Sequence, residues 1–331
     1  MDLCRVQREA LFITFFLVAV VLLSLSLGQA SFSWEKLLHG DEQQWFLIFQ
    51  LRLPRVVYGL LIGSLLAGAG LLFQSLFRND LATPFTLGVA SGASLGAALF
   101  FCGVVSLSAV SLAGSVIASF VGASLTVLIV YSLAQTRAGF SPPVLLLAGV
   151  VLNFTFGSLV LLVQFMADQT QVFQLSRWFM GSLAVVGYQK LVILCPVWVL
   201  FVFLALRLRD ELCLMNMGYD LALSRGVDVK AVQRQIYFVV SLGVATVVAL
   251  SGVISFIGII VPYTLRLHMG SSNPNLLPLT LICGGGFLVL CDLVARVAAA
   301  PAELPVGVLT ALLGGPFFLW VLFRKRGGQG V

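Results

Sequence analysis

Long apolar runs alternate with short polar segments along nearly the whole chain. The clearest runs cover residues 54–76, 142–167, 191–206, 276–297 and 304–323. About 20 predominantly apolar residues are enough to cross the hydrocarbon core of a bilayer as a helix. The pattern therefore predicts a series of membrane-spanning helices joined by short loops.

Three further stretches decide how many helices there are. Residues 11–27 resemble a signal peptide, but the run exceeds the usual core of about 7 to 15 residues, so we predict a first span. No charged residue occurs in residues 85–133, which is too long for one helix and predicts two, with a break in residues 102–108. Residues 236–262 fit either one long helix or two short ones joined at Ser251 and Gly252.

The distribution of basic residues favours two helices in the last of these stretches. Lys and Arg accumulate in the cytoplasmic loops of membrane proteins. Ten spans with a cytoplasmic N-terminus place 13 of the 19 basic residues inside, whereas nine spans would put Arg324, Lys325 and Arg326 outside. We therefore predict ten spans with both termini in the cytoplasm.

Composition excludes a soluble protein. Hydrophobic residues make up 60% of the chain and charged residues 10%, and the mean hydropathy is +1.07, whereas soluble domains carry about 25% charged residues. The spans use most of the 331 residues, so we expect a single transmembrane domain over residues 1–331. The net charge of +6 is explained by loop topology, and no nucleic-acid partner is expected. Six cysteines without CxxC spacing and two distant histidines predict neither a metal site nor a cofactor.

Two polar segments interrupt the apolar pattern. Residues 207–234, here called the polar segment, carry nine of the 32 charged residues and contain a predicted short helix that ends at Gly226. Such a segment cannot lie in hydrocarbon, so we expect a cytoplasmic segment held by a partner protein. Residues 168–190 are too polar to span the membrane and too patterned for a plain linker, so we expect a short helix on the outer surface.

Six basic residues are predicted on the outer side, where basic residues are disfavoured: Lys36, Arg52, Arg55, Arg177, Lys190 and Arg296. Arg52 and Arg55 flank the start of the second span, and Arg296 is near the outer end of the ninth, one turn after Asp292. Arginine pairs well with carboxylates, so one interpretation is docking of acidic groups on an external partner. The other is contact with lipid headgroups, together with a simple ion pair between Asp292 and Arg296. Spacing alone leaves both open.

The chain lacks the motifs of a self-sufficient pump or enzyme. GxxxxGK[ST] and HExxH are both absent, and no paired carboxylates occur within a predicted span. ATP hydrolysis would therefore have to take place in another subunit, which makes this chain non-catalytic. A secondary transporter driven by an ion gradient would need midplane carboxylates and inverted repeats, and neither is visible, but it remains the alternative from a different class.

An ordered set of motifs resembles a known family. The matching stretches are LRLPR (51–55), FQ...FRNDLATPFTLGVASGAS (73–94), LLAG (146–149), RWFMGSL (177–183), SRGVDV (224–229), GVISFIGIIVPYTLRL (252–267) and PAELPVGVLTALLGGPFFLWVL (301–322). In this order they resemble the FecCD-type permeases, the membrane subunits of ABC importers for iron-siderophores, haem and vitamin B12. The resemblance covers nearly the whole chain.

The resemblance implies an all-α, BtuC-like ABC transporter permease fold in the cytoplasmic (inner) membrane of a bacterium or archaeon. It implies a second permease copy or close homologue, two ATP-binding cassette ATPase subunits, and a periplasmic or lipoprotein substrate-binding protein. The expected substrate is a metal chelate, namely an iron-siderophore or haem, with vitamin B12 (cobalamin) as the alternative within the family.

The resemblance also assigns roles to individual residues. Arg52, Arg55 and Arg296 would receive glutamates of the binding protein. In the polar segment, Ala222 to Gly226 is similar to the Ala-x-x-x-Gly core of coupling helices, so ATPase coupling is assigned to Ala222, Arg225 and Gly226.

Further candidates concern the translocation pathway. Asn153 and Gln164 in the fifth span, and a break at Gly314, Gly315 and Pro316 in the tenth, are the predicted lining and gate. Arg177 would face the outer vestibule and attract anionic chelates, although a headgroup contact explains it equally well. Tyr263 occupies a position where relatives often have histidine, and tyrosine does not titrate near neutral pH.

Overall fold

The computed structural model describes residues 17–28, 35, 39–104, 111–136, 139–140, 142–270, 273–299 and 302–327. These residues are almost entirely helical, with one two-stranded antiparallel hairpin among them. The first described helix covers Leu17–Ser26. The elements that follow are α3 (Glu42–Phe46), the π-helix η1 (Leu47–Arg52), α4 (Leu53–Phe77), the 3-10 helix η2 (Pro84–Leu87), α5 (Val89–Phe101), α6 (Ser111–Ala134), β1 (Gln135–Thr136), β2 (Gly139–Phe140), α7 (Pro142–Met166), α8 (Gln169–Phe179), α9 (Gln189–Arg207), α10 (Arg209–Met217), α11 (Tyr219–Ser224), α12 (Val229–Ser251), α13 (Ile257–Met269), α14 (Leu276–Val297) and α15 (Val306–Gly327).

Six of the described helical segments are long and apolar enough to cross a membrane. They are the continuous segment Glu42–Phe77, Ala113–Ala134, α7, α9, α12 and α14, and shorter apolar helices cover Leu17–Ser26, Val89–Phe101 and Val306–Val321. These lengths confirm an all-helical protein with several spans. The count of ten stays a prediction, because α5 and α13 have only 13 residues each.

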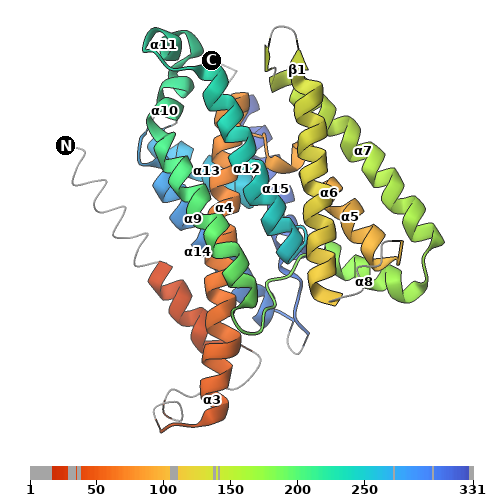
Figure 1. Ribbon diagram of the computed structural model, residues 1–331. Coiled ribbons are helices and arrows are strands. Elements are labelled where there is room, and N and C mark those ends of the chain that lie inside the picture. Colours follow the sequence, from red (N-terminus) through yellow and green to blue (C-terminus); the bar gives the residue numbers. More distant parts are fainter. Residues whose placement is uncertain are drawn as a thin grey trace.

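The long helix α4 is the centre of the packing. It packs against α9, α12, α13 and α14, while α5, α6, α7 and α8 lie together on one side (Figure 1). Glycines allow the close approach that such packing needs. A side chain at Gly63 would overlap the backbone of Gly284, and one at Gly70 would overlap the backbone of Gly258. The same arrangement joins α5 to α6, where Gly92 lies against Gly122.

Most predicted boundaries are confirmed. The break in the uncharged run falls between α5 and α6, and α12 is separated from α13 at Gly252, whose φ of +73° is readily adopted only by glycine. Residues 168–190 contain the expected short helix, α8. The polar segment contains α10 and α11, but its last residues already belong to α12, which begins at Val229.

Two sequence predictions about helix continuity are wrong. The helix that contains the second span does not begin after Pro54 as predicted, because it is continuous from Glu42 and takes in part of the predicted outer loop. A proline in a helix clashes with the carbonyl one turn earlier, and the π-helical turn η1 directly before Pro54 provides the altered geometry that accommodates it.

The predicted break at Gly314, Gly315 and Pro316 is also absent, since α15 runs unbroken through all three residues. The φ angle of proline suits a helix even though its missing N–H costs a hydrogen bond. Gly314 serves packing instead, because the ring of Phe256 occupies the space that its side chain would fill.

Candidate functional site: an arginine-lined cavity and the polar segment

The three arginines singled out in the sequence gather at the end of the molecule nearer α3. Arg52 ends η1, Arg55 lies in the first turn of α4, and Arg296 lies in the last turn of α14. All three line one cavity of about 640 Å³, here called the arginine cavity. Its remaining lining residues are Gly28, Leu47, Leu51, Ala184, Val185, Val186, Gln189, Lys190 and Glu303.

Arg52 is bound to the end of the first helix. Its Nη1 donates to the carbonyl oxygens of Leu25 at 2.6 Å and Ser26 at 2.8 Å, and the residue is only 5% exposed. The last carbonyls of a helix have no partner within the helix and carry partial negative charge. Arg52 therefore caps the C-terminus of Leu17–Ser26 and fixes that helix against η1.

Arg55 and Arg296 share one buried carboxylate. Arg55 holds Asp292 with Nε and Nη2, the shortest of these bonds being 2.9 Å, and its Nη1 donates to Oε2 of Glu303 at 2.9 Å. Arg296 Nε lies 3.0 Å from Asp292 Oδ2 and Arg296 Nη2 donates to the hydroxyl of Ser24. A carboxylate that is 2% exposed is tolerated only when it is paired in this way.

This arrangement confirms the ion pair between Asp292 and Arg296 and alters the docking interpretation. Docking itself stays a prediction. Arg296 is 4% exposed and already contacts Asp292 and Ser24, so it stabilises the fold. Arg55, whose side chain is 14% exposed, is more accessible to a partner than Arg296.

The arginine cavity keeps an excess of positive charge. Four basic residues line it, and among the described residues around it two acids oppose them: Glu303 in the lining and Asp292 behind it. The fourth basic residue, Lys190, was not a candidate in the sequence analysis. Its position at the end of the polar stretch 168–190, on the predicted outer side where basic residues are disfavoured, was the available signal.

Arg177 lies close to the same cluster. It is exposed in the last turn of α8 and lines a smaller cavity of about 130 Å³ together with Arg55, Asp292 and Glu303. The structure therefore brings together all four arginines that the sequence placed on the outer side. A nearby anion would feel their combined charge.

The predicted pathway residues do not form one site within the chain. Asn153 on α7 donates to the carbonyl of Phe85 at 3.3 Å and so ties α7 to η2, while Gln164 is half-buried farther along α7. The helix α7 packs against α5, α6 and η2, whereas α15, which carries Gly314, packs against α13 and α14. Tyr263 is buried against the ring of Phe317.

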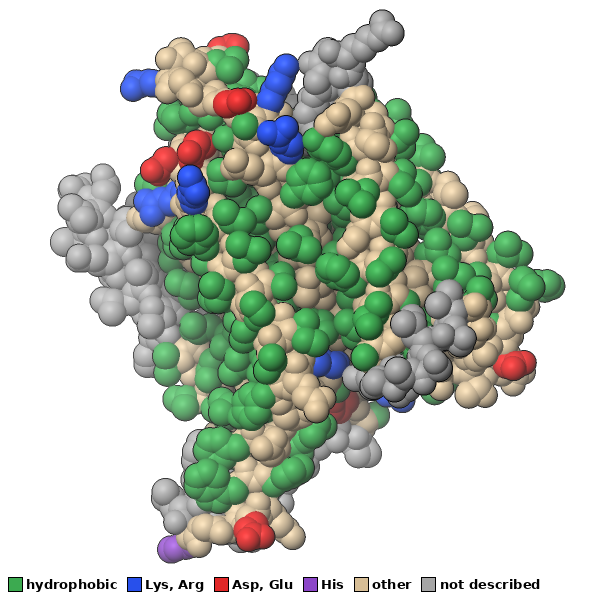
Figure 2. Space-filling model, in the orientation of Figure 1, with side chains coloured by type: hydrophobic (Ala, Val, Ile, Leu, Met, Phe, Trp, Pro, Cys, Tyr) green, Lys and Arg blue, Asp and Glu red, His purple; other side chains and the backbone are tan. Residues whose placement is uncertain are grey.

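The polar segment is at the opposite end of the molecule from α3 (Figure 1). Its short helix α11 ends as predicted: Gly226 has a φ of +81°, and the N–H of Val227 donates to the carbonyl of Ala222 at 3.0 Å. Ala222 is buried, whereas Arg225 and Gly226 are exposed. Charged side chains gather over this end, while the middle of the same face is largely hydrophobic (Figure 2).

Tyr219 anchors the polar segment to the bundle. Its hydroxyl donates to the carbonyl of Leu76 in the last turn of α4 at 3.0 Å and accepts from Gln233 of α12 at 3.3 Å. The guanidinium of Arg78 lies 4.8 Å from the centroid of the Tyr219 ring. Beyond this anchor, Met217, Leu221 and Leu223 expose between 39% and 58% of their surface.

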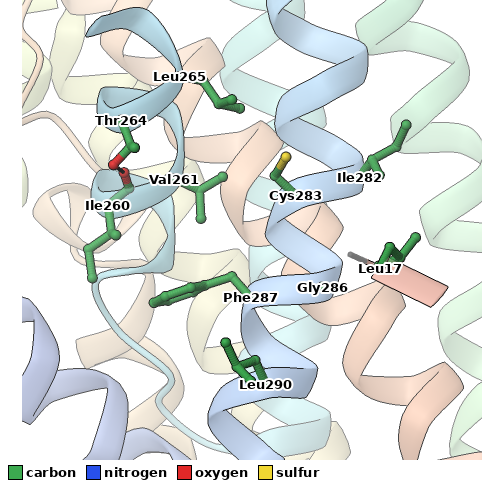
Figure 3. A pocket seen from close by; sticks show the side chains of 10 residues that line it. All are labelled: Leu17, Ile260, Val261, Thr264, Leu265, Ile282, Cys283, Gly286, Phe287 and Leu290. Carbon is green, nitrogen blue, oxygen red and sulfur yellow. Dashed lines mark hydrogen bonds between the residues drawn. The ribbon is translucent and has the colours of Figure 1, made fainter. Parts of the chain in front are cut away.

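An apolar cavity of about 300 Å³ lies beside the first helix. Residues of α13 and α14, together with Leu17, surround it (Figure 3). Its lining carries no charged side chain, and Thr264 and Cys283 are its most polar members. It is therefore unsuited to bind an anion, unlike the arginine cavity.

Comparison with known proteins identifies the fold. The model of a protein family described as "FecCD transport family" matches residues 16–324. The chain is 34% identical to the hemin transport system permease protein HmuU of Yersinia pestis, covering 97% of this chain and 98% of that protein. It is 37% identical to the vitamin B12 import system permease protein BtuC of Vibrio cholerae, covering 97% and 96%. A solved structure of a metal-chelate type ABC transporter in an inward-facing conformation matches with a TM-score of 0.86 at 31% identity, covering 96% of this chain and 99% of that one. The chain belongs to the FecCD transport family.

Proposed function

We propose that this chain is the membrane-spanning permease subunit of an ATP-driven importer for a metal chelate, with an iron-siderophore or haem as substrate. The observation that carries the proposal is the agreement in sequence and fold, over nearly the full length, with permeases of this class. Vitamin B12 is the second candidate, because BtuC of Vibrio cholerae is as similar as the hemin permease.

The proposed topology has ten spans with both termini in the cytoplasm. The six long apolar segments are six of these spans, and Leu17–Ser26, α5, α13 and α15 are the other four. This topology puts the arginine cavity and α8 outside and the polar segment inside. It is supported by the separation of α3 and α11 at opposite ends of the molecule (Figure 1).

Each end of the molecule is proposed to bind its own partner. Acidic side chains of an external substrate-binding protein enter the arginine cavity, where the excess positive charge favours them. Inside, an ATPase subunit binds α10 and α11, whose exposed Met217, Leu221 and Leu223 offer an apolar contact beside charged residues. A second permease copy or close homologue completes the pathway, and the two halves alternate between outward-open and inward-open states.

The proposal is tested by transport into proteoliposomes with purified components. Uptake of the radiolabelled chelate should require the ATPase subunits, the binding protein and ATP together. A variant ATPase that binds but does not hydrolyse ATP is the matched control. Uptake that proceeds at the full rate without any ATPase subunit would show that an ion gradient drives transport, and the importer proposal would be wrong.

A further inference from the structure

The four basic residues that line the arginine cavity differ in the partners that compensate their charge. Arg55 and Arg296 are neutralised by Asp292 and Glu303, and Arg52 is held by carbonyl oxygens at the end of the first helix. Lys190 differs from all three, since no described residue forms a hydrogen bond or ion pair with it. A half-buried ammonium group whose one described electrostatic contact is the ring of Tyr58 is costly unless a ligand supplies the missing negative charge.

The position of Lys190 is fixed by the backbone around it. Lys190 lies in the first turn of α9, and the two residues before this helix are tied to η1: the N–H of Gly187 donates to the carbonyl of Gln50, and the hydroxyl of Tyr188 donates to the carbonyl of Phe49, both at 2.8 Å. Its Nζ lies 5.8 Å from the ring centroid of the buried Tyr58. The lysine is therefore held at the cavity wall on the same backbone frame that carries Arg52.

We propose that Lys190 is a further binding residue of the arginine cavity and pairs with a carboxylate of the external substrate-binding protein. This inference rests on the proposed docking function and adds a residue that the family resemblance does not assign. An ammonium group suits a single carboxylate oxygen, whereas the fork of Arg55 is already occupied on both sides by Asp292 and Glu303.

The surroundings of Lys190 favour a protein carboxylate as the ligand. The cavity of about 640 Å³ is far larger than one headgroup phosphate needs, and apolar side chains, including Leu47, Leu51 and the 69% exposed Val186, form much of its wall. A single phosphate would leave these apolar side chains uncovered, whereas a protein loop can pack against them while it presents a carboxylate, as protein interfaces combine apolar and polar contacts. We therefore assign the site to an acidic side chain presented by such a loop.

The test measures the affinity of the cognate binding protein for the complete importer in nanodiscs. Lys190→Gln should weaken binding roughly tenfold or more, the usual effect of losing a hydrogen bond to a charged group, and should reduce the dependence of affinity on salt. Lys190→Arg should retain the affinity to within about threefold, because it keeps the charge. Lys230→Gln removes the same charge from the polar segment, which is proposed to be cytoplasmic, and should leave affinity unchanged.

The partner carboxylate is found by a double-mutant cycle. Each surface Asp or Glu of the binding protein is changed to its amide, and the amide variant of the true partner should cause no further loss once Lys190→Gln is present. If no acidic position couples to Lys190, the assignment is wrong.

Four other outcomes also overturn the inference. If Lys190→Gln binds normally while Arg55→Gln binds weakly, docking stands and the assignment of Lys190 is wrong. If both bind normally, the proposed docking function fails as well. A loss that appears only in nanodiscs with phosphatidylglycerol assigns Lys190 to lipid phosphate, and a loss confined to the chelate-loaded binding protein assigns it to the chelate.

Discussion

Replacing Asp292 by Asn should be among the most destabilising single changes at the arginine cavity. The side chain is 3% exposed, accepts hydrogen bonds from Arg55, and lies 3.0 Å from Nε of Arg296. Asn removes the negative charge but keeps the shape, so two arginines are left close together with Glu303 as their remaining described counter-charge. Breaking a buried ion pair by removing one partner costs about 3–5 kcal/mol.

The assay is the thermal stability of the purified importer, followed as the fraction that remains monodisperse after heating. With an unfolding entropy of about 2.1 cal/mol/K per residue, a cost of this size should lower the transition temperature by about 4–7 °C in a chain of this length. The matched control is the double variant Asp292→Asn with Arg296→Gln. Since it also removes one of the two stranded cations, it should recover part of the loss. An unchanged transition in the single variant, or a double variant less stable than the single one, would refute the reasoning.

Two further predictions concern packing and coupling. Gly70→Ala should prevent assembly of a stable protein, because the new methyl group would overlap the backbone of Gly258. Gly157→Ala should be close to neutral, because its methyl group would meet no described atom within 4 Å. Yield and monodispersity after detergent extraction measure both effects. Tyr219→Phe should cost about 1 kcal/mol in stability, because the hydrogen bonds to Leu76 and Gln233 are lost. It should also lower severalfold the ATPase activity that the loaded binding protein stimulates. Stimulation at the normal level would contradict the anchoring role of this hydroxyl.

Helix positions were predictable because the bilayer imposes a simple rule on the sequence. Apolar runs have to be long, and polar residues mark their ends, so α7, α9 and α14 begin and end within two residues of the predicted bounds. The rule fails where a helix continues beyond the apolar run, as it does before Pro54, since polar residues in a helix outside the bilayer leave no boundary signal.

The roles of the charged residues were less predictable, because they depend on contacts between distant parts of the chain. The sequence predicts that Arg52 and Arg296 lie on the disfavoured side. It does not predict that both bind the end of the first helix, more than 20 residues away from Arg52 and more than 260 from Arg296. The i, i+4 spacing correctly predicted the ion pair between Asp292 and Arg296, since a helix alone brings the two side chains together. The bidentate contact from Arg55, 237 residues from Asp292, required the tertiary structure.

The helix α4 physically connects the two proposed binding ends. Arg55 in its first turn lines the arginine cavity, and the carbonyl of Leu76 in its last turn accepts the hydroxyl of Tyr219, which anchors the polar segment. At 1.5 Å per residue, its 25 residues span about 37 Å without a break. A rigid element in contact with both sites can carry coupling between them only if its position differs between the two states of the importer.

Thermodynamic linkage makes this connection measurable from either end. If docking shifts α4, then nucleotide binding by the ATPase has to change the affinity of the binding protein by the same factor by which docking changes the nucleotide affinity. Tyr219→Phe loosens the contact at one end of α4 while leaving the arginine cavity intact, so it should reduce both factors equally. Because the equality of the two factors is a thermodynamic necessity, their size is the test. If both factors keep their normal value in Tyr219→Phe, the contact at this end of α4 does not carry the coupling.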